Sequence, residues 1–283
     1  MPTSADVERF LAELHGAPVR DLAPLTGGFW SSAWSYLVGG DQLVARFGEM
    51  KHGFEADRAA MAYSSDDLPV PDVLDVGDAP WDGLAYAISR RHHGRFLEDM
   101  GPEVAPALGR LLAALRAVPP DDAAPSWRDG LLERLVIDQP PGWRERLRNH
   151  PDAEAAFERA AAQLRELIPS LPERRDLIHG DLLHKNVLVA DDGSRVNAVF
   201  SWKCSVRGDH LYDLAWCTFW SDIEYPGIAT AVDRTLADDD ERLRHHAYEL
   251  HIGATHLGWH AWTGELDWLE KNVAAVSRLT APA

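Results

Sequence analysis

The sequence has few cysteines and no long apolar run, and both absences narrow the class of protein. Cysteine occurs twice in 283 residues, at Cys204 and Cys217, and neither position belongs to a CxxC or Cys/His pattern with zinc spacing. We therefore expect no disulfide framework. No stretch reaches the ~18 apolar residues that a membrane-spanning helix needs, and residues 1–20 contain no basic segment followed by an apolar one. These absences predict a cytoplasmic protein.

Two familiar phosphate-binding patterns are missing as well. The chain contains neither a Walker A segment nor a complete GxGxxG. A weaker candidate is TGGFWSS at residues 26–32, in which Gly27, Gly28 and Ser31 could cover phosphate groups with backbone N–H groups. A glycine pair is also typical of an ordinary turn, so the sequence alone leaves both interpretations open.

Basic residues are scarce: 28 Lys and Arg stand against 45 Asp and Glu, and the formal net charge is -17. A surface of this kind repels nucleic acid and anionic membranes and attracts cations. We therefore expect no nucleic-acid or membrane partner and a small-molecule ligand, for which a cation is one candidate. We expect a monomer, although the charge does not bear on the oligomeric state. An acidic surface that only maintains solubility would explain the same charge.

The order of predicted elements divides the chain into two parts. After a short first helix, strand patterns and glycine turns up to Arg91 predict five antiparallel strands with one inserted helix. Residues 92–283 are mostly helical, with a small hairpin near 187–200 and four helical patterns between Leu211 and Leu279. We predict an α+β protein with an N-terminal lobe, residues 1–91, a helical C-terminal lobe, residues 92–283, and a ligand cleft between the lobes.

The segment HGDLLHKN at residues 179–186 contains the residue types that phosphoryl transfer needs. This reaction depends on positioning and on neutralisation of charge. Asp181 can orient an acceptor hydroxyl, and Asn186, five residues later, can reach a magnesium ion through its amide oxygen. A His-Gly-Asp tripeptide alone would be only a turn. The asparagine at this offset, the hairpin that follows and the helical tail favour a catalytic loop.

This segment resembles the catalytic loop of the aminoglycoside phosphotransferase family. Further similarity lies in GDHLYDLA at 208–215 and, with hygromycin phosphotransferases in particular, in LPVPDVLDVG at 68–77 and YAISRR at 86–91. The resemblance implies a two-lobed protein-kinase-like fold, with Mg²⁺ and with ATP or GTP as phosphate donor. It implies transfer of the γ-phosphate to a hydroxyl of a small antibiotic. A hygromycin-like aminoglycoside is the first candidate substrate and a nucleoside antibiotic the second.

The resemblance also implies roles in nucleotide binding. Arg46 would clamp the α and β phosphates where the family usually has a lysine, because its guanidinium can make a bidentate contact. Its partner would be Asp57 rather than Glu55 on the following helix. An arginine that only extends into solvent is the alternative. Backbone groups from Ile88 to Arg90 would meet the purine edge.

The clearest departure from the family pattern is Ser201, in AVFSW at residues 198–202. The family has an aspartate here that bridges magnesium and the phosphates, and a neutral hydroxyl is a weaker magnesium ligand. The chain could recruit another carboxylate such as Asp209, could be a slow kinase, or could be a catalytically silent pseudokinase. Because Asp181 and Asn186 remain, we favour turnover, with Asn186 and Ser201 at the metal.

Aromatic and acidic residues in the C-terminal part suggest the substrate site. Six of the eleven tryptophans follow residue 200, and their rings could stack on a sugar or heterocycle while neighbouring carboxylates bind ammonium groups. Most of these rings could equally fill a helical core. The resemblance gives Asp209 a bracing role on the catalytic loop. The predicted substrate-site residues are Asp209, Trp202, Asp222, Glu224 and Trp262.

Overall fold

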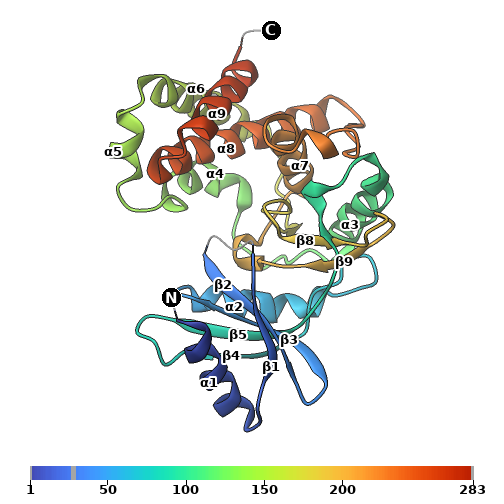
Figure 1. Cartoon of the computed structure of the whole chain (residues 1–283). Helices are drawn as coiled ribbons and strands as arrows, with labels where there is room; N and C mark the ends of the chain where they lie inside the picture. The colour runs from blue at the N-terminus through green and yellow to red at the C-terminus, as the bar shows by residue number, and fades with distance from the viewer. Residues whose placement is uncertain (1, 27–29, 282–283) are drawn as a thin grey trace.

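The computed structural model describes residues 2–26 and 30–281 and consists of a sheet part and a helical part (Figure 1). In that view the N-terminal sheet lies at the bottom and the C-terminal helices lie at the top. No helix among the described residues is both long and apolar enough to cross a membrane. The arrangement confirms the predicted α+β class.

Within the described residues, the N-terminal part forms a five-stranded antiparallel sheet with the order β1-β2-β3-β5-β4. A short turn at Gly39 and Gly40 joins β2 to β3, and the positive φ angles of these glycines suit a hairpin turn. The prediction of five strands with one inserted helix is confirmed. The elements are α1 (Ser4–His15), β1 (Arg20–Leu25), β2 (Ser31–Val38), β3 (Asp41–Gly48), α2 (Lys51–Ala60), β4 (Val73–Asp78) and β5 (Ala85–Arg90).

Two helices cover opposite faces of this sheet. Helix α1 packs against the face that holds Tyr86 and Ile88. Helix α2 packs against the face that holds Ala85 and Ala87. These residues alternate along β5 because successive side chains of a strand point to opposite faces. Because alanine side chains are small, α2 can lie close to β5 on this face of the sheet.

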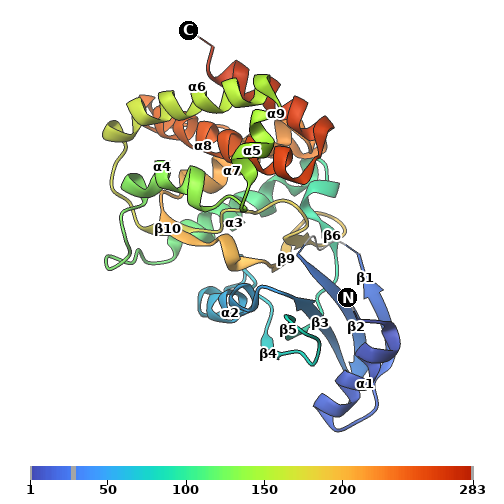
Figure 2. The same ribbon diagram turned by 90° about the vertical axis from the view of Figure 1, so that its left-hand side faces the viewer.

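The C-terminal part is built around α8, which packs against α6, α7 and α9 (Figure 2). Its α-helices are α3 (Ala105–Ala117), α4 (Trp127–Ile137), α5 (Trp143–Arg148), α6 (Pro151–Leu167), α7 (Leu211–Ile223), α8 (Asp239–Thr263) and α9 (Leu266–Leu279). Residues 211–279, all of them described, form three α-helices and the one-turn 3-10 helix η6 (Pro226–Ile228), where the sequence predicted four helical patterns. Helix α8 runs without a break until Gly264 ends it in a left-handed conformation.

Two small sheets lie between these parts and carry the loops of the site. Figure 1 shows β8 and β9, and Figure 2 shows β6 and β9, between the large sheet and the helices. The predicted hairpin is confirmed, and the loop from β7 to β8 and the segment after β9 both face the junction. The strands are β6 (Arg95–Phe96), β8 (Val187–Val189) and β9 (Val196–Val199) in one sheet, and β7 (Asp176–Ile178) and β10 (Val206–Gly208) in the other.

Candidate active site

A cleft of about 1120 Å³ lies at the junction of the two parts. The sheet part contributes Arg46 and Asp57 to its lining, and the loop between β7 and β8 contributes Asp181 and Asn186. Ser201, which follows β9, lines the same space. The cleft predicted from the order of elements is therefore present, and residues that are distant in sequence meet in it.

Buried Asp213, in the first turn of α7, holds the start of the catalytic loop. Its carboxylate accepts hydrogen bonds from the backbone N–H groups of His179 at 2.9 Å and Gly180 at 2.8 Å. Burial raises the pKa of the Asp213 carboxyl, while the hydrogen bonds from the two backbone N–H groups oppose that rise. Gly180 has a φ of 79°, and a Cβ there would lie 2.9 Å from the carbonyl oxygen of Cys204. The turn therefore requires glycine.

His179 connects the catalytic loop to the segment after β9. Its Nε2 lies 2.8 Å from the carbonyl oxygen of Phe200, and its Nδ1 accepts the backbone N–H of Asp181 at 3.2 Å. These partners fix the neutral tautomer with the proton on Nε2. The ring is completely buried and packs edge-on against Trp202. His179 supports the loop and does not reach the cleft.

Asp181 is linked through His184 to a second carboxylate. His184 Nδ1 lies 2.8 Å from Asp181 Oδ1, and His184 Nε2 lies 3.5 Å from Glu224 Oε2. Burial disfavours the charged ring, but hydrogen bonds to the two carboxylates outweigh it and raise the pKa of His184 to about 10. The imidazolium also packs edge-on against Trp220. Sequence reasoning missed this link because the spacing of three residues alone does not indicate that the side chains meet.

The backbone at His184 and Lys185 is left-handed, with φ angles of 60° and 67°. Such angles are unfavourable for residues with a Cβ and persist only where their surroundings fix them. The buried Glu98 of η2 (Leu97–Asp99) accepts the backbone N–H of Lys185 and helps to fix this turn. As a result, Asp181 and Asn186 face the same side of the loop.

Asn186 completes the loop. Its Nδ2 donates a hydrogen bond to the carbonyl oxygen of Asp181 at 2.9 Å, which leaves the amide oxygen available for a ligand. Both side chains line the cleft. The loop can therefore present a carboxylate and an amide oxygen to one bound molecule.

Arg46 is held at the cleft by Asp57, as predicted. The distance from Arg46 Nη2 to Asp57 Oδ2 is 2.5 Å, and the other oxygen of Asp57 accepts the backbone N–H of Trp202 at 2.7 Å. The guanidinium also lies over the ring of Phe54, with 5.1 Å between Cζ and the ring centroid. Asp57 therefore ties Arg46 to the segment after β9, whereas Glu55 is exposed.

Comparisons with known proteins show the family. The model of the phosphotransferase enzyme family (APH) matches residues 21–248. The chain belongs to this family. Hygromycin-B 4-O-kinase from Escherichia coli is 30% identical over 302 residues, which cover 98% of this chain and 86% of that protein. The chain is therefore a phosphotransferase with the two-lobed protein-kinase-like fold.

Solved structures of related enzymes have the same architecture as this phosphotransferase. A thermostable mutant of aminoglycoside phosphotransferase APH(4)-Ia in a ternary complex with AMP-PNP and hygromycin B has a TM-score of 0.84 at 28% identity, and the match covers 97% of this chain and 98% of that chain. The apo form of a thermostable mutant gives a TM-score of 0.83 at 28% identity, over 96% and 98% of the two chains. The predicted resemblance to aminoglycoside and hygromycin phosphotransferases is confirmed.

Ser201 of the phosphotransferase has a left-handed backbone, with φ 62° and ψ 55°, immediately before η5 (Trp202–Cys204). Among residues with a side chain, Asn and Asp tolerate this region best. The backbone therefore has a shape that suits an aspartate, while the side chain offers a neutral hydroxyl to the cleft.

The oxygen donors at this point fit a magnesium ion that is held mainly by a nucleotide. Asn186, Ser201 and Asp181 face the same space. At nucleotide sites Mg²⁺ keeps several waters and binds phosphate oxygens with one or two carboxylates. Among the described residues, three ligand atoms of His, Cys, Asp or Glu converge at one place outside this lining, formed by Asp176, Asp209 and His210. The oxygens of Asn186 and Ser201 would therefore suit one ion with few protein ligands, and in the described lining Ser201 supplies a hydroxyl there in place of a carboxylate.

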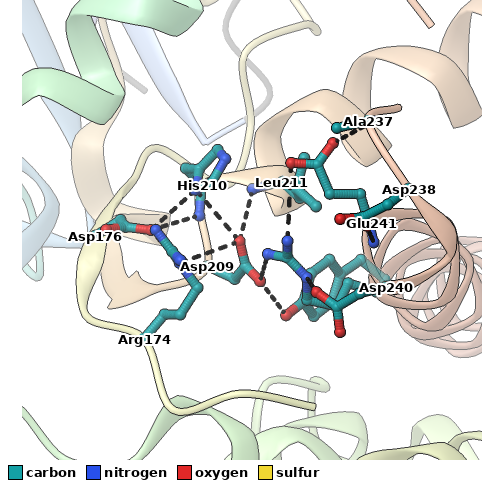
Figure 3. A network of polar contacts seen from close by, with 11 residues as sticks. Arg174, Asp176, Asp209, His210, Leu211, Ala237, Asp238, Asp240 and Glu241 are labelled. Atoms are coloured by element: carbon teal, nitrogen blue, oxygen red, sulfur yellow. Dashed lines mark hydrogen bonds and ion pairs between the residues drawn. The ribbon is translucent and has the colours of Figure 1, made fainter. Parts of the chain in front are cut away.

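The position of Asp209 contradicts all three of its predicted roles (Figure 3). Its fully buried carboxylate accepts hydrogen bonds from Arg244 at 2.7 Å and Tyr248 at 3.0 Å, both from α8, and from the backbone N–H of Leu211 at 3.1 Å. It does not line the cleft, so it cannot contact the substrate or replace the carboxylate missing at Ser201. The bracing role belongs to Asp213, one turn further along the chain.

Three more predicted substrate residues lie outside the cleft lining. Trp202 is 1% exposed and packs in the core, Asp222 forms a surface ion pair with Arg234 at 2.6 Å, and Trp262 stacks on a neighbouring tryptophan of α8. Glu224 does line the cleft. Rings that the sequence left undistinguished line it instead: Trp30, Trp127, Tyr212, Trp216, Trp220, Tyr225, His251, His256, Trp259, His260 and Trp268.

Two more of the residues predicted to contact the nucleotide belong to the lining of the cleft. Ser31 and Arg90 line the cleft, and the guanidinium of Arg90 pairs with two aspartates of the sheet part. The side chain of Ile88 is 1% exposed and points into the core, so only its backbone could serve a nucleotide. Gly27 and Gly28 lie outside the described residues.

Proposed function

We propose that this phosphotransferase transfers the γ-phosphate of a purine nucleotide, ATP or GTP, to a hydroxyl of an antibiotic. A hygromycin-like aminoglycoside is the first candidate acceptor. The observation that carries the proposal is that Asp181 and Asn186 face one cleft together with Arg46. The printed names of the relatives, a hygromycin-B kinase and a complex with AMP-PNP and hygromycin B, support the same donor and acceptor classes.

In the proposed reaction Asp181 accepts a hydrogen bond from the acceptor hydroxyl and aims its oxygen at the γ-phosphorus. The bond from that oxygen to phosphorus forms while the bond to the β-phosphate oxygen breaks, and the nucleoside diphosphate leaves. Because His184 occupies Oδ1 of Asp181, the hydroxyl proton would be directed to Oδ2. Arg46 would contact the α and β phosphates as a bidentate donor.

The N-terminal lobe, residues 1–91, would bind the nucleotide. Backbone groups from Ile88 to Arg90 would meet the purine edge, and the loop with Gly27, Gly28 and Ser31 would cover the phosphates. Magnesium would neutralise phosphate charge, with Asn186 and Ser201 as its protein ligands. We also propose that the enzyme acts as a monomer in the cytoplasm.

The lining of the C-terminal lobe, residues 92–283, supports a ring-shaped acceptor with positive charge. The carboxylates of Asp138, Glu224 and Glu265 line this side of the cleft together with many aromatic rings. Carboxylates bind ammonium groups, and aromatic faces stack on sugar rings. The same rings would also stack on a base, so a nucleoside antibiotic is the second candidate.

The test is the mass of the product formed with ATP or GTP over a panel of antibiotics. The panel contains hygromycin B, other aminoglycosides and nucleoside antibiotics. We expect an acceptor heavier by one phosphoryl group with at least one compound, and none with Asp181→Asn. Nucleotide binding without any phosphorylated product would instead support the pseudokinase that Ser201 raised as an alternative.

A further inference from the structure

The segment after β9 lacks the negative charge that would hold a metal ion against the phosphates. Ser201 is neutral, and Arg46 is already paired with Asp57 at 2.5 Å. A nucleoside triphosphate would therefore meet little uncompensated positive charge from these two residues. Phosphoryl transfer requires positive charge next to the transferred group and next to the leaving diphosphate, because both carry negative charge.

Lys203, two residues after Ser201, brings a cation to this side. It belongs to η5 and lines the cleft. Its stem runs along α2, since a Cβ built on Gly53 would lie 3.4 Å from Lys203 Cβ and 3.9 Å from Cδ. Its Nζ lies 4.3 Å from the centroid of the Trp30 ring. The stem is therefore packed between elements, and the ammonium is fixed at the cleft.

The ammonium of Lys203 has no counter-ion within residues 2–26 and 30–281: no Asp or Glu oxygen of these residues lies within 4.0 Å of Nζ. Two other cations of the cleft are paired, Arg134 with Asp138 at 3.5 Å and Arg90 with Asp41 at 3.3 Å. A partly buried charge without a partner is unfavourable, and the face of Trp30 offsets only part of that penalty. Such a group is suited to an anion that arrives with a ligand.

We propose that Lys203 binds the β and γ phosphates of the nucleotide and replaces part of the charge that an aspartate-held metal ion would bring. The inference rests on the proposed function, which supplies the nucleotide. Serine at 201 fits this role, because an aspartate so close to Lys203 could pair with the ammonium and neutralise it. Arg46 from β3 and Lys203 from η5 then flank the phosphates, and binding depends less on Mg²⁺.

The test is calorimetric titration of AMP-PNP into the full chain in EDTA and in Mg²⁺, with wild type, Lys203→Met and Lys203→Arg. In EDTA we expect Lys203→Met to weaken binding about 30-fold, within the range for removing one partner of a desolvated charge pair. Lys203→Arg keeps the charge and should lose less. Wild type should bind only a few-fold more weakly in EDTA than in Mg²⁺.

The matched control is Lys271→Met. Lys271 Nζ lies 3.9 Å from the centroid of the Trp268 ring, so this change removes the same charge and the same kind of ring contact at a lysine that does not itself line the cleft. It should leave the Kd unchanged. Equal Kd values for wild type and Lys203→Met in EDTA would overturn the role of Lys203, and product formation would then show that the proposed function survives. No nucleotide binding by wild type in either buffer would overturn both.

Discussion

Two neighbouring segments line the cleft, and they differ in the charged and polar side chains that they carry. The catalytic loop, residues 179–186, keeps a carboxylate and an amide on a backbone that buried Asp213 fixes with two hydrogen bonds. The segment 200–204 is fixed as firmly, by the bond from Trp202 N–H to Asp57. Its side chains toward the cleft, however, are a hydroxyl and an ammonium. A fold can therefore keep its backbone where the charges on it differ from the family pattern.

This difference in charge corresponds to two separate requirements of phosphoryl transfer, orientation of the acceptor and neutralisation of charge on the donor. In the proposed reaction the catalytic loop orients the acceptor, and its charges are balanced locally because His184 lies between Asp181 and Glu224. In the same proposal the segment 200–204 faces the donor, and it carries positive charge at Lys203 without a described carboxylate partner. Changes in the first segment should therefore affect turnover, and changes in the second should affect the ion dependence of nucleotide binding.

The largest effect is expected for Asp181→Asn. The amide cannot accept the hydroxyl proton, so the rate of product formation should fall about 10³-fold, as is typical for loss of a general base. Nucleotide Kd should change less than about 3-fold, since the residue acts on the acceptor. Initial rates and calorimetry measure both quantities. If turnover persists at the wild-type rate, the assignment of Asp181 is wrong.

A smaller loss of turnover, about 10²-fold, is expected for Asp213→Asn. An amide offers one acceptor oxygen where the two N–H groups of His179 and Gly180 now meet a carboxylate, and an unsatisfied buried donor costs about 1–3 kcal/mol. The loop that carries Asp181 should lose its fixed position. The midpoint of thermal unfolding and kcat should therefore fall together.

Asp209→Asn is the matched control for this prediction, because Asp209 is equally buried at the start of the same helix. Breaking its pair with Arg244 should destabilise the fold by about 3–5 kcal/mol. The folded fraction should nevertheless keep most of its kcat. Equal losses of kcat for the two variants would show that the position of Asp213 under the loop has no special role.

The contrast between these two aspartates also shows what the sequence could predict. The offset of Asn186 from Asp181, with the hairpin and helices that follow, predicted those two site residues, and glycine turns with alternating strands predicted the sheet. The pair Arg46–Asp57 was predicted from the resemblance to the family. Which of two aspartates one turn apart faces the loop depends on how α7 is rotated against β7, and no local pattern encodes that rotation. The same holds for the tryptophans, where Trp216 and Trp220 line the cleft and Trp202 does not.

Ser201→Asp should make nucleotide binding at the segment 200–204 depend more strongly on Mg²⁺. The new carboxylate can pair with Lys203, so AMP-PNP binding in EDTA should weaken about 10-fold, as expected for a like charge placed near the phosphates. Binding in Mg²⁺ should be retained, because the carboxylate is a good magnesium ligand. Stability should not fall, since aspartate tolerates the left-handed backbone.

Ser205→Asp is the control for this change, because it adds the same charge outside the cleft lining on an extended backbone. Its binding of AMP-PNP should resemble that of wild type in both buffers. If Ser201→Asp binds AMP-PNP equally well with and without Mg²⁺, the proposal is contradicted that Lys203 supplies charge which an aspartate-held metal ion would otherwise supply.

The smallest effect is expected for His184→Asn, which tests whether the charge balance of the first segment positions Asp181. Asparagine tolerates the φ of 60° at this position, so the backbone should persist while the bond to Asp181 Oδ1 is lost. A hydrogen bond to a charged group is worth about 1.5–3 kcal/mol, and we expect kcat to fall about 10-fold with an unchanged KM for the nucleotide. Glu224→Gln leaves the bond to Asp181 in place and should lower kcat less. A rise in the KM for the nucleotide with kcat unchanged would show that His184 contributes to nucleotide binding. The proposal that the two segments serve acceptor and donor separately would then be wrong.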